Sequence, residues 1–357
     1  MLSHLLKDIR VLDISSVLAG PSVGMFLAEL GAEVIKIENP NTNGDITRQW
    51  KNSKEQSSSP ISAYYASVNA FKKIEFVDFN MPDNVQKIHQ LIPQIDIVIT
   101  NFKYGDDKKF QLDYNTLKQL NPRLIYAQIS GFGKEDTRIA YDLVLQAETG
   151  FMYLNRQPHQ LPNKMPVALI DVLAAHQLKE GILLALYQRL KTDQGAYVHC
   201  SLYDAAVCSL MNQAANYLVA GFNPPPMGSE HPNIAPYGEL FETLDKQYIT
   251  FAIGSNRQFT HLCQVLNLND IAEHPKYSVN AERVKNRKEL YQILQERIKH
   301  LSAEEIYNKC LQNDIPIALI KDIQSVMIDQ RTQKLIKPVE IEEQKLQIIT
   351  SIAFELL

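Results

Sequence analysis

Apolar and polar positions follow two different periods along the first half of the chain, and their alternation predicts the fold. Short apolar runs, which are typical of buried strands, are separated by segments with an apolar residue every three or four positions, the spacing of an α-helix. The predicted strands are Ile9–Ile14, Glu33–Ile37, Lys73–Phe79, Asp96–Thr100, Leu124–Ser130 and Val198–Leu202. The predicted helices are one from Pro21 to a stop at Gly31, then Asp83–Ile92, Tyr114–Leu120, Val172–Lys191 and Asp204–Ala220. Because parallel strands need a crossover that is usually a helix, this order predicts an α/β fold with a Rossmann-like parallel sheet.

A segment rich in proline and glycine, Gly221–Gly228, marks a change in composition and a domain boundary. After it, strand-like and helix-like segments alternate less regularly, from the strand Tyr248–Ile253 to the short strand Pro316–Ile320. We therefore expect a large domain over residues 1–220 and a smaller α+β domain over 221–322. Residues 323–357 are expected to return to the large domain.

Composition narrows the class of protein. The 357 residues carry 36 Lys plus Arg and 40 Asp plus Glu, a formal charge of −4, so no positive excess suggests a nucleic acid partner. No run approaches the roughly 18 consecutive apolar residues of a membrane span, and the N-terminus has no apolar core of signal-peptide type. The four cysteines form no C-x-x-C pair, which argues against a zinc site or a disulfide framework. We expect a cytoplasmic protein with no metal, no membrane association and no nucleic acid.

The loop after the first predicted strand, Leu18–Gly24, stands where a dinucleotide-binding fold would carry G-x-G-x-x-G. Pro21 removes a backbone donor from this loop, at a place where a phosphate would need one. The sheet therefore has the order of a nucleotide-binding fold but lacks the standard nucleotide motif.

Sequence blocks along nearly the whole chain, in order, resemble the family III CoA-transferases (the CaiB/BaiF family). These blocks are Val11–Trp50, Thr100–Gly105, Leu112–Tyr114, Asn121–Tyr126, Ser130–Gly133, Tyr141–Leu143 and His231–Tyr237. The resemblance implies that CoA passes from an acyl-CoA thioester to a carboxylic acid, through an aspartyl mixed anhydride and an enzyme–CoA thioester. It also implies an interlocked, ring-shaped homodimer. CoA would be a substrate, with no permanently bound cofactor.

The resemblance places the nucleophile at Asp171, 29 residues after Asp142 (171 − 142 = 29). From the residues alone, the simpler interpretation is that Asp171 caps a helix starting at Val172. Both roles are compatible, and a carboxylate at a helix N-terminus is expected to stay ionised, as a nucleophile must.

Tyr141 separates two branches of the family. The racemase branch has histidine at this position, paired with the aspartate that matches Asp171 as an acid and a base. A phenol, with an ordinary pKa of about 10, accepts protons poorly at neutral pH. Tyr141 therefore favours a transferase over an α-methylacyl-CoA racemase, and Asp142 is a candidate for orienting the substrate. A non-catalytic acyl-CoA-binding paralogue is a third alternative.

The resemblance also suggests which residues surround CoA. They are Val17, Leu18 and Ala19 along the pantetheine arm, and Val77, Asn101 and Phe102 near the adenine and ribose. Lys109 matches a cationic position for phosphate, although it is equally consistent with a solvated surface lysine. Asn39 stands where the formyl-CoA branch has arginine, so Arg48 is a candidate for the missing charge. Alternatively, Arg48 pairs only with Asp45.

Overall fold

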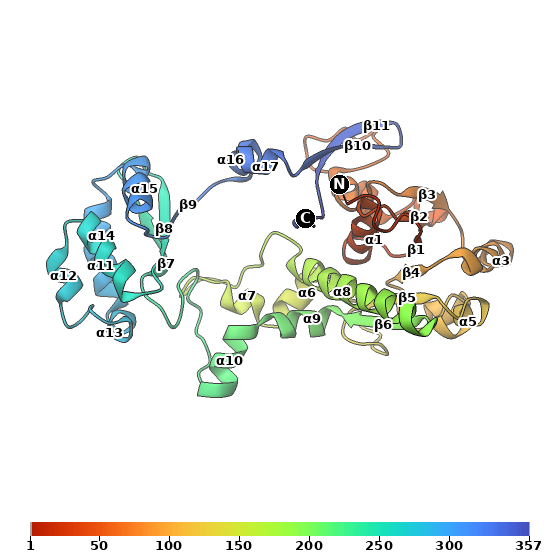
Figure 1. Cartoon of the computed structure of the whole chain (residues 1–357), viewed down its shortest axis with the longest axis horizontal. Coiled ribbons are helices and arrows are strands. Elements are labelled where there is room, and N and C mark those ends of the chain that lie inside the picture. The colour runs from red at the N-terminus through yellow and green to blue at the C-terminus, as the bar shows by residue number, and fades with distance from the viewer. Residues whose placement is uncertain (1, 357) are drawn as a thin grey trace. The chain divides into compact units, whose positions relative to one another are not determined.

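The computed structural model describes residues 2–356, which form two compact units (Figure 1). The first unit contains residues 2–149, 165–211 and 330–356, and the second contains residues 150–164 and 212–329. This division groups residues 150–164 and 212–220 with the second unit, and the boundaries predicted at 220 and 322 stay predictions. In the part of the chain that the structure describes, no helix is long and apolar enough to cross a membrane.

A six-stranded, fully parallel sheet forms the centre of the first unit. Its strands, in spatial order, are β3 (Lys73–Phe76), β2 (Glu33–Glu38), β1 (Arg10–Asp13), β4 (Ile97–Thr100), β5 (Ile125–Ser130) and β6 (Ala196–Ser201). The strand order reverses between β1 and β4, which is the position where open α/β sheets bind ligands. The predicted α/β class and the six predicted strands are confirmed.

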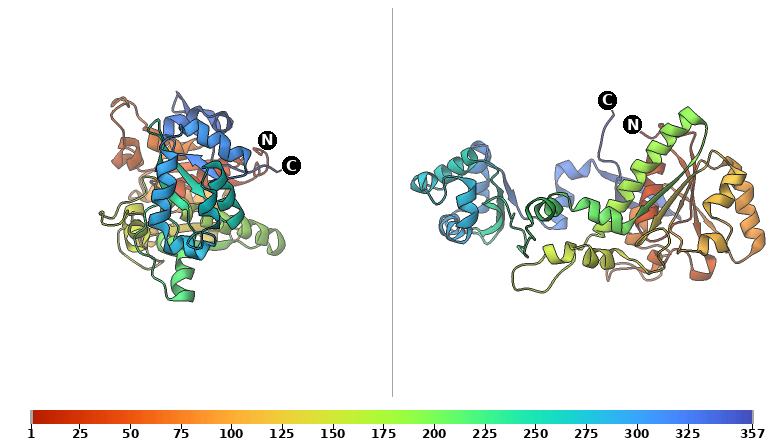
Figure 2. Two further views of the ribbon diagram at one scale, coloured as in Figure 1. Left: turned by 90° about the vertical axis from the view of Figure 1, so that its left-hand side faces the viewer. Right: turned by 90° about the horizontal axis from the view of Figure 1, so that it is seen from below.

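Helices cover both faces of this sheet (Figure 2). The helices α1 (Ala19–Glu29) and α8 (Leu169–Thr192) lie together on one face, and α3 (Pro82–Leu91) and α5 (Tyr114–Leu120) lie on the other. A buried core joins the second pair of helices to the strands; it includes Leu12, Ile35, Val85, Ile88, Val98, Leu117 and Tyr126. Helices packed on both faces therefore hold the strands in place, including their carboxyl ends.

The remaining elements of the first unit are short. They are η1 (Pro40–Thr42), η2 (Ile46–Gln49), α2 (Ala63–Asn69), η3 (Ile92–Gln94), α4 (Asp106–Lys109), α6 (Asp142–Glu148), α9 (Leu202–Ser209) and α17 (Gln330–Gln333). Several predicted boundaries differ from the structure, among them the start of α8, which begins at Leu169 and not at Val172. The first helix begins at Ala19, before Pro21, and β3 ends at Phe76. The single helix predicted over Asp204–Ala220 is two helices, because the backbone at Met211 turns to φ +36° between α9 and α10 (Met211–Ala220).

The C-terminal segment returns to the first unit as a β-hairpin, β10 (Ile336–Ile341) and β11 (Gln344–Ile349), which the sequence did not predict. Arg48 holds its turn, because its guanidinium donates to both carboxylate oxygens of Glu342, at 2.7 and 3.1 Å. Thr350 and Ser351, just after the hairpin, donate to Glu29 of α1. These contacts join the hairpin to the first unit, and the predicted return over residues 323–357 stays a prediction.

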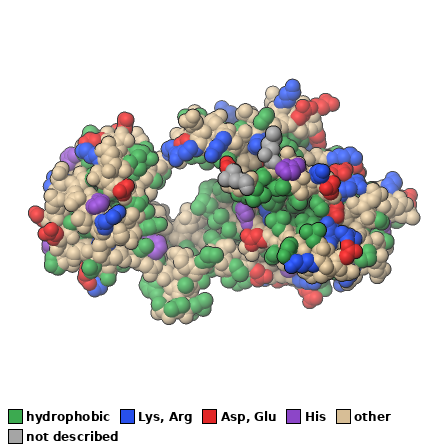
Figure 3. Space-filling model, viewed as in Figure 1, with side chains coloured by type: hydrophobic (Ala, Val, Ile, Leu, Met, Phe, Trp, Pro, Cys, Tyr) green, Lys and Arg blue, Asp and Glu red, His purple; other side chains and the backbone are tan. Residues whose placement is uncertain are grey.

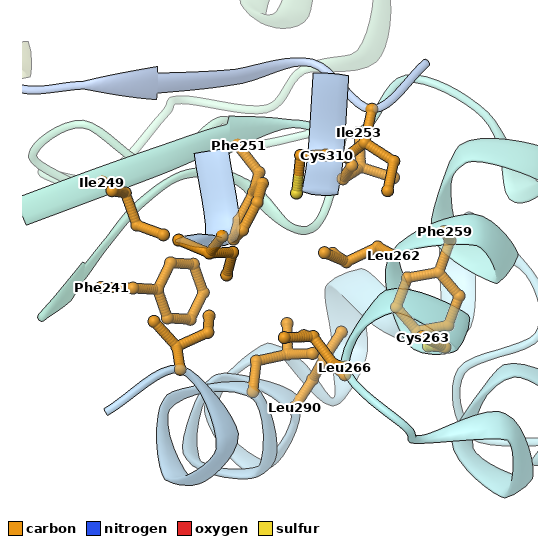
Figure 4. Close-up of a cluster of buried hydrophobic side chains, with 14 of the residues drawn as sticks. Phe241, Ile249, Phe251, Ile253, Phe259, Leu262, Cys263, Leu266, Leu290 and Cys310 are labelled. Carbon is orange, nitrogen blue, oxygen red and sulfur yellow. The ribbon is translucent and has the colours of Figure 1, made fainter. Parts of the chain in front are cut away.

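The second unit has an antiparallel sheet of β7 (Tyr237–Glu242), β8 (Tyr248–Ala252) and β9 (Ile317–Leu319). Its helices are α7 (Phe151–Leu154), α11 (Asn256–Val265), α12 (Asn269–Glu273), α13 (Asn280–Lys285), α14 (Arg287–Ile298), α15 (Ala303–Gln312) and α16 (Ile323–Ile328), besides most of α10. Figure 4 shows the core between sheet and helices, where Phe241 and Phe251 face Leu262 and Leu290. This core is separate from that of the first unit.

Gly195, between α8 and β6, tests how closely this connection packs. A Cβ atom there would lie 2.0 Å from the carbonyl oxygen of Leu124, the residue before β5. This is a backbone atom, so it cannot rotate away as a side chain could. We expect Gly195→Ala to lower the free energy of unfolding by about 1–3 kcal/mol, because overpacking forces the backbone to shift. Thermal unfolding followed by circular dichroism measures the change. The control is Gly254→Ala, whose nearest neighbour would be 3.7 Å away. Equal melting temperatures for the two variants would contradict the packing argument.

Candidate active site

A cavity of about 190 Å³ opens at the carboxyl edge of the parallel sheet, within the first unit. Its walls come from segments that follow β1, β4 and β5, and from the first turns of α8 and α9. Among the lining residues are Val17, Leu18, Ala19, Asn101, Phe102, Tyr141 and Asp171. The structure therefore brings together seven of the residues that the sequence suggested, at the edge where the fold class places ligands.

Asp171 lies in this cavity with its side chain only 7% exposed. No hydrogen bond from the residues that the structure describes reaches its carboxylate, which lines the cavity. Burial, and then the negative charge of Asp142, raise the pKa of Asp171 from its ordinary value of 3.8 to about 7. A carboxyl group with a strongly raised pKa inside a cavity is a candidate for chemistry.

Two expectations about Asp171 are wrong. It does not cap a helix, because α8 begins at Leu169 and Asp171 is already its third residue. The acceptor for the first turn is Asp142, whose Oδ1 accepts from the backbone N–H of Ile170 at 2.7 Å. Nor does the helix N-terminus keep the carboxylate fully ionised near pH 7, since burial and the charge of Asp142 outweigh it.

Asp142 organises the segment before α8. Its Oδ2 accepts from the Gln146 side chain at 2.7 Å, and Gln146 Oε1 accepts from the backbone N–H of Met165 at 2.8 Å. Asp142 thus connects α6 to the start of α8. Tyr141, the residue before α6, lines the cavity with 52% of its surface exposed. The orienting role suggested for Asp142 stays a prediction, and its contacts are those of a residue that positions Asp171.

Tyr64, on α2, is a residue of this region that the sequence did not reveal. Burial and the charges of Asp171, Asp142 and Asp45 raise the pKa of its phenol to about 12, so all three carboxylates act on it. Its ring meets that of Trp50 edge-on, with 5.1 Å between the centroids. Nothing distinguishes Tyr64 from its neighbour Tyr65 in the sequence, so only the fold could identify it.

The loop after β1 has an unusual backbone. Val17 has φ +74°, a conformation that a β-branched residue rarely adopts. The Val17 N–H donates to Asp45 Oδ2 at 3.1 Å, and Asn101 forms hydrogen bonds with both the N–H and the carbonyl of Ser16. Asn101 therefore lines the cavity and also holds the loop that forms another part of its wall.

Three suggested CoA contacts are absent from the residues that line this cavity. Val77 packs against the core beside α3, and the exposed Lys109 borders a separate cavity of about 380 Å³. Arg48 is 6% exposed and donates to Glu38 and Glu342, which are its carboxylate partners in place of Asp45. The roles of these residues toward CoA remain predictions, although Arg48 is already engaged in holding the C-terminal hairpin.

Other cations line the cavity instead. Lys103, Lys134 and Arg138 all contribute to its walls, and none of them was among the predicted residues. Arg138 is paired with Asp136 and Glu148. Lys103 lies within the block Thr100–Gly105, and Lys134 directly follows the block Ser130–Gly133. These positions were the sequence signal that could have identified the two lysines as cavity residues. No group of three or more His, Cys, Asp or Glu side chains that could hold a metal ion occurs in the described chain.

The raised pKa of Asp171 should make stability depend on pH. The native state holds this proton to about pH 7, whereas the unfolded chain releases it near pH 3.8, so this contribution to stability is lost as the pH rises between these values. Asp171→Asn removes the effect. We expect the variant to melt at a higher temperature than the wild type, with a larger difference at pH 8 than at pH 5, worth on the order of a few kcal/mol. Calorimetry at both pH values measures it.

The control for this experiment is Asp83→Asn, at an exposed aspartate in the first turn of α3. Its effect on the melting temperature should be the same at pH 5 and pH 8. An Asp171→Asn difference that does not change between these pH values would contradict the raised pKa.

Comparisons with known proteins agree with the geometry. Residues 6–354 match the model of CoA-transferase family III. The chain is 33% identical over 353 residues to the succinate–glutarate CoA-transferase of Agrobacterium fabrum, covering 97% of this chain and 88% of that protein. It is 34% identical over 335 residues to the human succinyl-CoA:glutarate CoA-transferase, covering 91% of this chain and 73% of that protein. Solved structures are similar as well. A crystal structure of a CaiB/BaiF family protein from Brucella suis aligns with a TM-score of 0.83 at 32% identity, over 99% of this chain and 93% of that one. The crystal structure of Rv3272 from Mycobacterium tuberculosis aligns with a TM-score of 0.86 at 26% identity, over 100% of this chain and 94% of that one. Because the family match spans nearly the whole chain, the protein belongs to CoA-transferase family III and is an enzyme that uses CoA thioesters as substrates.

Proposed function

We propose that this enzyme transfers CoA from the CoA thioester of a dicarboxylic acid to a second carboxylic acid, with Asp171 as the nucleophile. The observation that carries the proposal is the Asp171 carboxylate, which is 7% exposed, without a hydrogen-bond partner in the described chain, and in contact with the cavity. A carboxylate that opens into a cavity and is not held by another side chain is free to attack an electrophile bound there.

The chemistry needs only exchange between activated acyl groups. A carboxylate oxygen of Asp171 attacks the thioester carbonyl and the C–S bond breaks. CoA leaves as a thiolate, and the acyl group stays on Asp171 as a mixed anhydride. The thiolate then attacks the aspartyl carbonyl, which releases the first acid and leaves an aspartyl–CoA thioester. The second acid attacks this thioester and the same steps run in reverse. Each intermediate is about as activated as the one before it, so no external source of energy is required.

The substrates proposed are short dicarboxylic acids. Relatives carry the names succinate–glutarate, succinyl-CoA:mesaconate and acetyl-CoA:oxalate CoA-transferase. Lys103 and Lys134 line the cavity and form no ion pair with a carboxylate in the part of the chain described, so they are available to anionic groups of the ligand. Tyr141 at the cavity supports a transferase in preference to a racemase, because a phenol is a poor base at neutral pH.

We also propose that two copies of the chain form the interlocked homodimer that the sequence resemblance implies. Large apolar side chains are exposed on α8, where Leu184 and Leu190 are 68% and 85% exposed. In the second unit, Leu218 and Val219 of α10 are 79% and 86% exposed. Figure 3 shows apolar surface over each of these helices. Exposed apolar surface of this kind is typical of protein–protein interfaces.

Light scattering after size exclusion tests the dimer. We expect a mass of about twice the 40.6 kDa of one chain, because the exposed apolar side chains would be covered by the second copy. The double variant Leu184→Glu and Leu190→Glu should lower the mass or prevent assembly, whereas Leu120→Glu on α5 serves as a control. A single-chain mass for the wild type at every concentration would refute the dimer.

Chemical trapping tests the nucleophile. Without an acceptor acid, the enzyme should stop as an aspartyl–CoA thioester, which hydroxylamine converts to a hydroxamate at Asp171. We expect mass spectrometry of the peptide that contains Ile170–Val172 to show this change only after addition of an acyl-CoA, such as succinyl-CoA. Asp171→Asn should show no adduct and lose at least a thousandfold of the transfer rate. Turnover of a proven substrate pair without any label on Asp171 would mean direct transfer, and the nucleophile would have to be abandoned.

A further inference from the structure

Polar side chains gather on one face of the parallel sheet where β5 and β6 end. The register pairs Gln128 with His199, and strand alternation puts Ser130 on the same face as Gln128. Ser130 Oγ lies 2.9 Å from His199 Nε2, within hydrogen-bond distance, and the Tyr197 hydroxyl donates to Gln128 Oε1. This row is not required by the fold, because a buried sheet face is normally apolar.

Two members of the row reach the Asp171 cavity with hydrogen-bonding capacity to spare. Gln128 is 5% exposed and lines the cavity, and because Tyr197 occupies its oxygen, its amide nitrogen is left as a donor without a partner among residues 2–356. Ser130 also lines the cavity and connects it to His199. A donor that opens into a cavity and has no protein partner is available to an acceptor on a ligand.

Lys134 adds a positive charge at the same place. It lines the cavity, and its Nζ lies 4.0 Å from the centre of the Tyr197 ring. Tyr197 is in turn 6.3 Å from His199, measured between ring centroids. No carboxylate forms an ion pair with Lys134 in the described chain, whereas the neighbouring Arg138 is already paired with Asp136. The cation–π contact fixes Lys134 without neutralising it.

We propose that Lys134, Gln128 and the Ser130–His199 pair form a subsite of the Asp171 cavity that binds an anionic group of the substrate. The group is either a phosphate of CoA or the distal carboxylate of a dicarboxylic acyl chain, since both are oxyanions that accept from several donors. The inference rests on the proposed function, because it takes the substrate to be an acyl-CoA.

The imidazole makes this subsite sensitive to pH. Burial and then the charge of Lys134 lower the pKa of His199, and Asp204 of α9 acts in the opposite direction. The other groups near it are Gln128 and Ser130 of β5 and the Tyr197 phenol of β6, which are polar but uncharged at neutral pH. An anion beside Lys134 would offset the lysine's charge and raise the pKa of His199. Substrate binding near neutral pH is therefore coupled to uptake of a proton, and affinity improves as the pH falls.

Calorimetric titration with unreactive CoA thioethers tests the charge. S-butyl-CoA and S-(3-carboxypropyl)-CoA carry the same phosphates, but only the second carries a distal carboxylate. S-butylpantetheine carries neither. We expect Lys134→Met to weaken binding of the anionic ligand about tenfold, the usual effect of one charge-assisted hydrogen bond. The matched control is Lys118→Met, an exposed lysine that lies 5.5 Å from the Tyr114 ring outside the cavity.

The three ligands identify the source of the anion. Loss of affinity for both CoA thioethers but not for S-butylpantetheine indicates a phosphate. Loss for S-(3-carboxypropyl)-CoA alone indicates the distal carboxylate. An equal loss for S-butylpantetheine, or no loss for any ligand, overturns the subsite. If the wild type binds no CoA thioether at all, the proposed function fails; if it binds and transfers while Lys134→Met changes nothing, only this inference fails.

Proton uptake tests His199 separately. Titration at pH 7 in two buffers with different heats of ionisation gives the number of protons bound with the ligand. His199→Gln keeps a hydrogen-bonding group near Ser130 but cannot titrate, so we expect it to take up fewer protons than the wild type. The control is His176→Gln, because burial and Lys179 also lower the pKa of His176, on α8. Equal uptake by the wild type and His199→Gln would overturn the role of the histidine.

Discussion

Two buried lysine–aspartate pairs lie beneath the loop that follows β1, and the shape of the cavity depends on them. Lys72 donates to Asp13 at 2.8 Å, and Lys36 lies 3.3 Å from Asp45, with all four side chains at most 1% exposed. Burial lowers the pKa of Lys72 to about 8, whereas for Asp13 the two lysines outweigh burial and the pKa is lowered. Loss of one partner would leave an uncompensated buried charge, which costs about 3–5 kcal/mol.

These charges hold the backbone of the loop in a conformation that it would not keep alone. Asp13 accepts from the Ser15 N–H, Lys36 donates to the Ser15 carbonyl, and Asp45 accepts from the Val17 N–H. The positive φ of Val17 costs about 1–3 kcal/mol, and it persists because these groups fix its neighbours. Val17 lines the cavity. The buried charged side chains therefore set the shape of that part of the wall, against the backbone conformation that valine prefers.

The sequence predicted what depends on local patterns, and missed what depends on tertiary contacts. The strand periods predicted the parallel sheet, and the family resemblance singled out Asp171, which the structure places in the cavity at the carboxyl edge of that sheet. The hairpin turn at Glu342 was missed because both its central residues adopt positive φ without glycine, and an ion pair with Arg48 fixes it. The ion pair of Arg48 with Glu342 was missed for the same reason, since a partner 294 residues away leaves no local signal. Tyr64 was missed because only the fold brings it near Asp171, whereas Lys134 was missed although it directly follows the block Ser130–Gly133.

The environment of Asp171 combines two effects that act in opposite directions on reactivity. Burial and Asp142 raise its pKa to about 7, so part of the population is protonated and cannot attack a thioester. The same burial limits the water around the carboxylate, which would favour the proposed attack by its ionised form and protect the proposed anhydride from hydrolysis. Asp142 can act on both effects at once, because it holds the backbone N–H of Ile170 and carries the charge that destabilises the ionised Asp171. In the proposed mechanism, bond formation between Asp171 and the substrate removes the negative charge that this cavity disfavours, so the attack relieves an unfavourable charge of the free site.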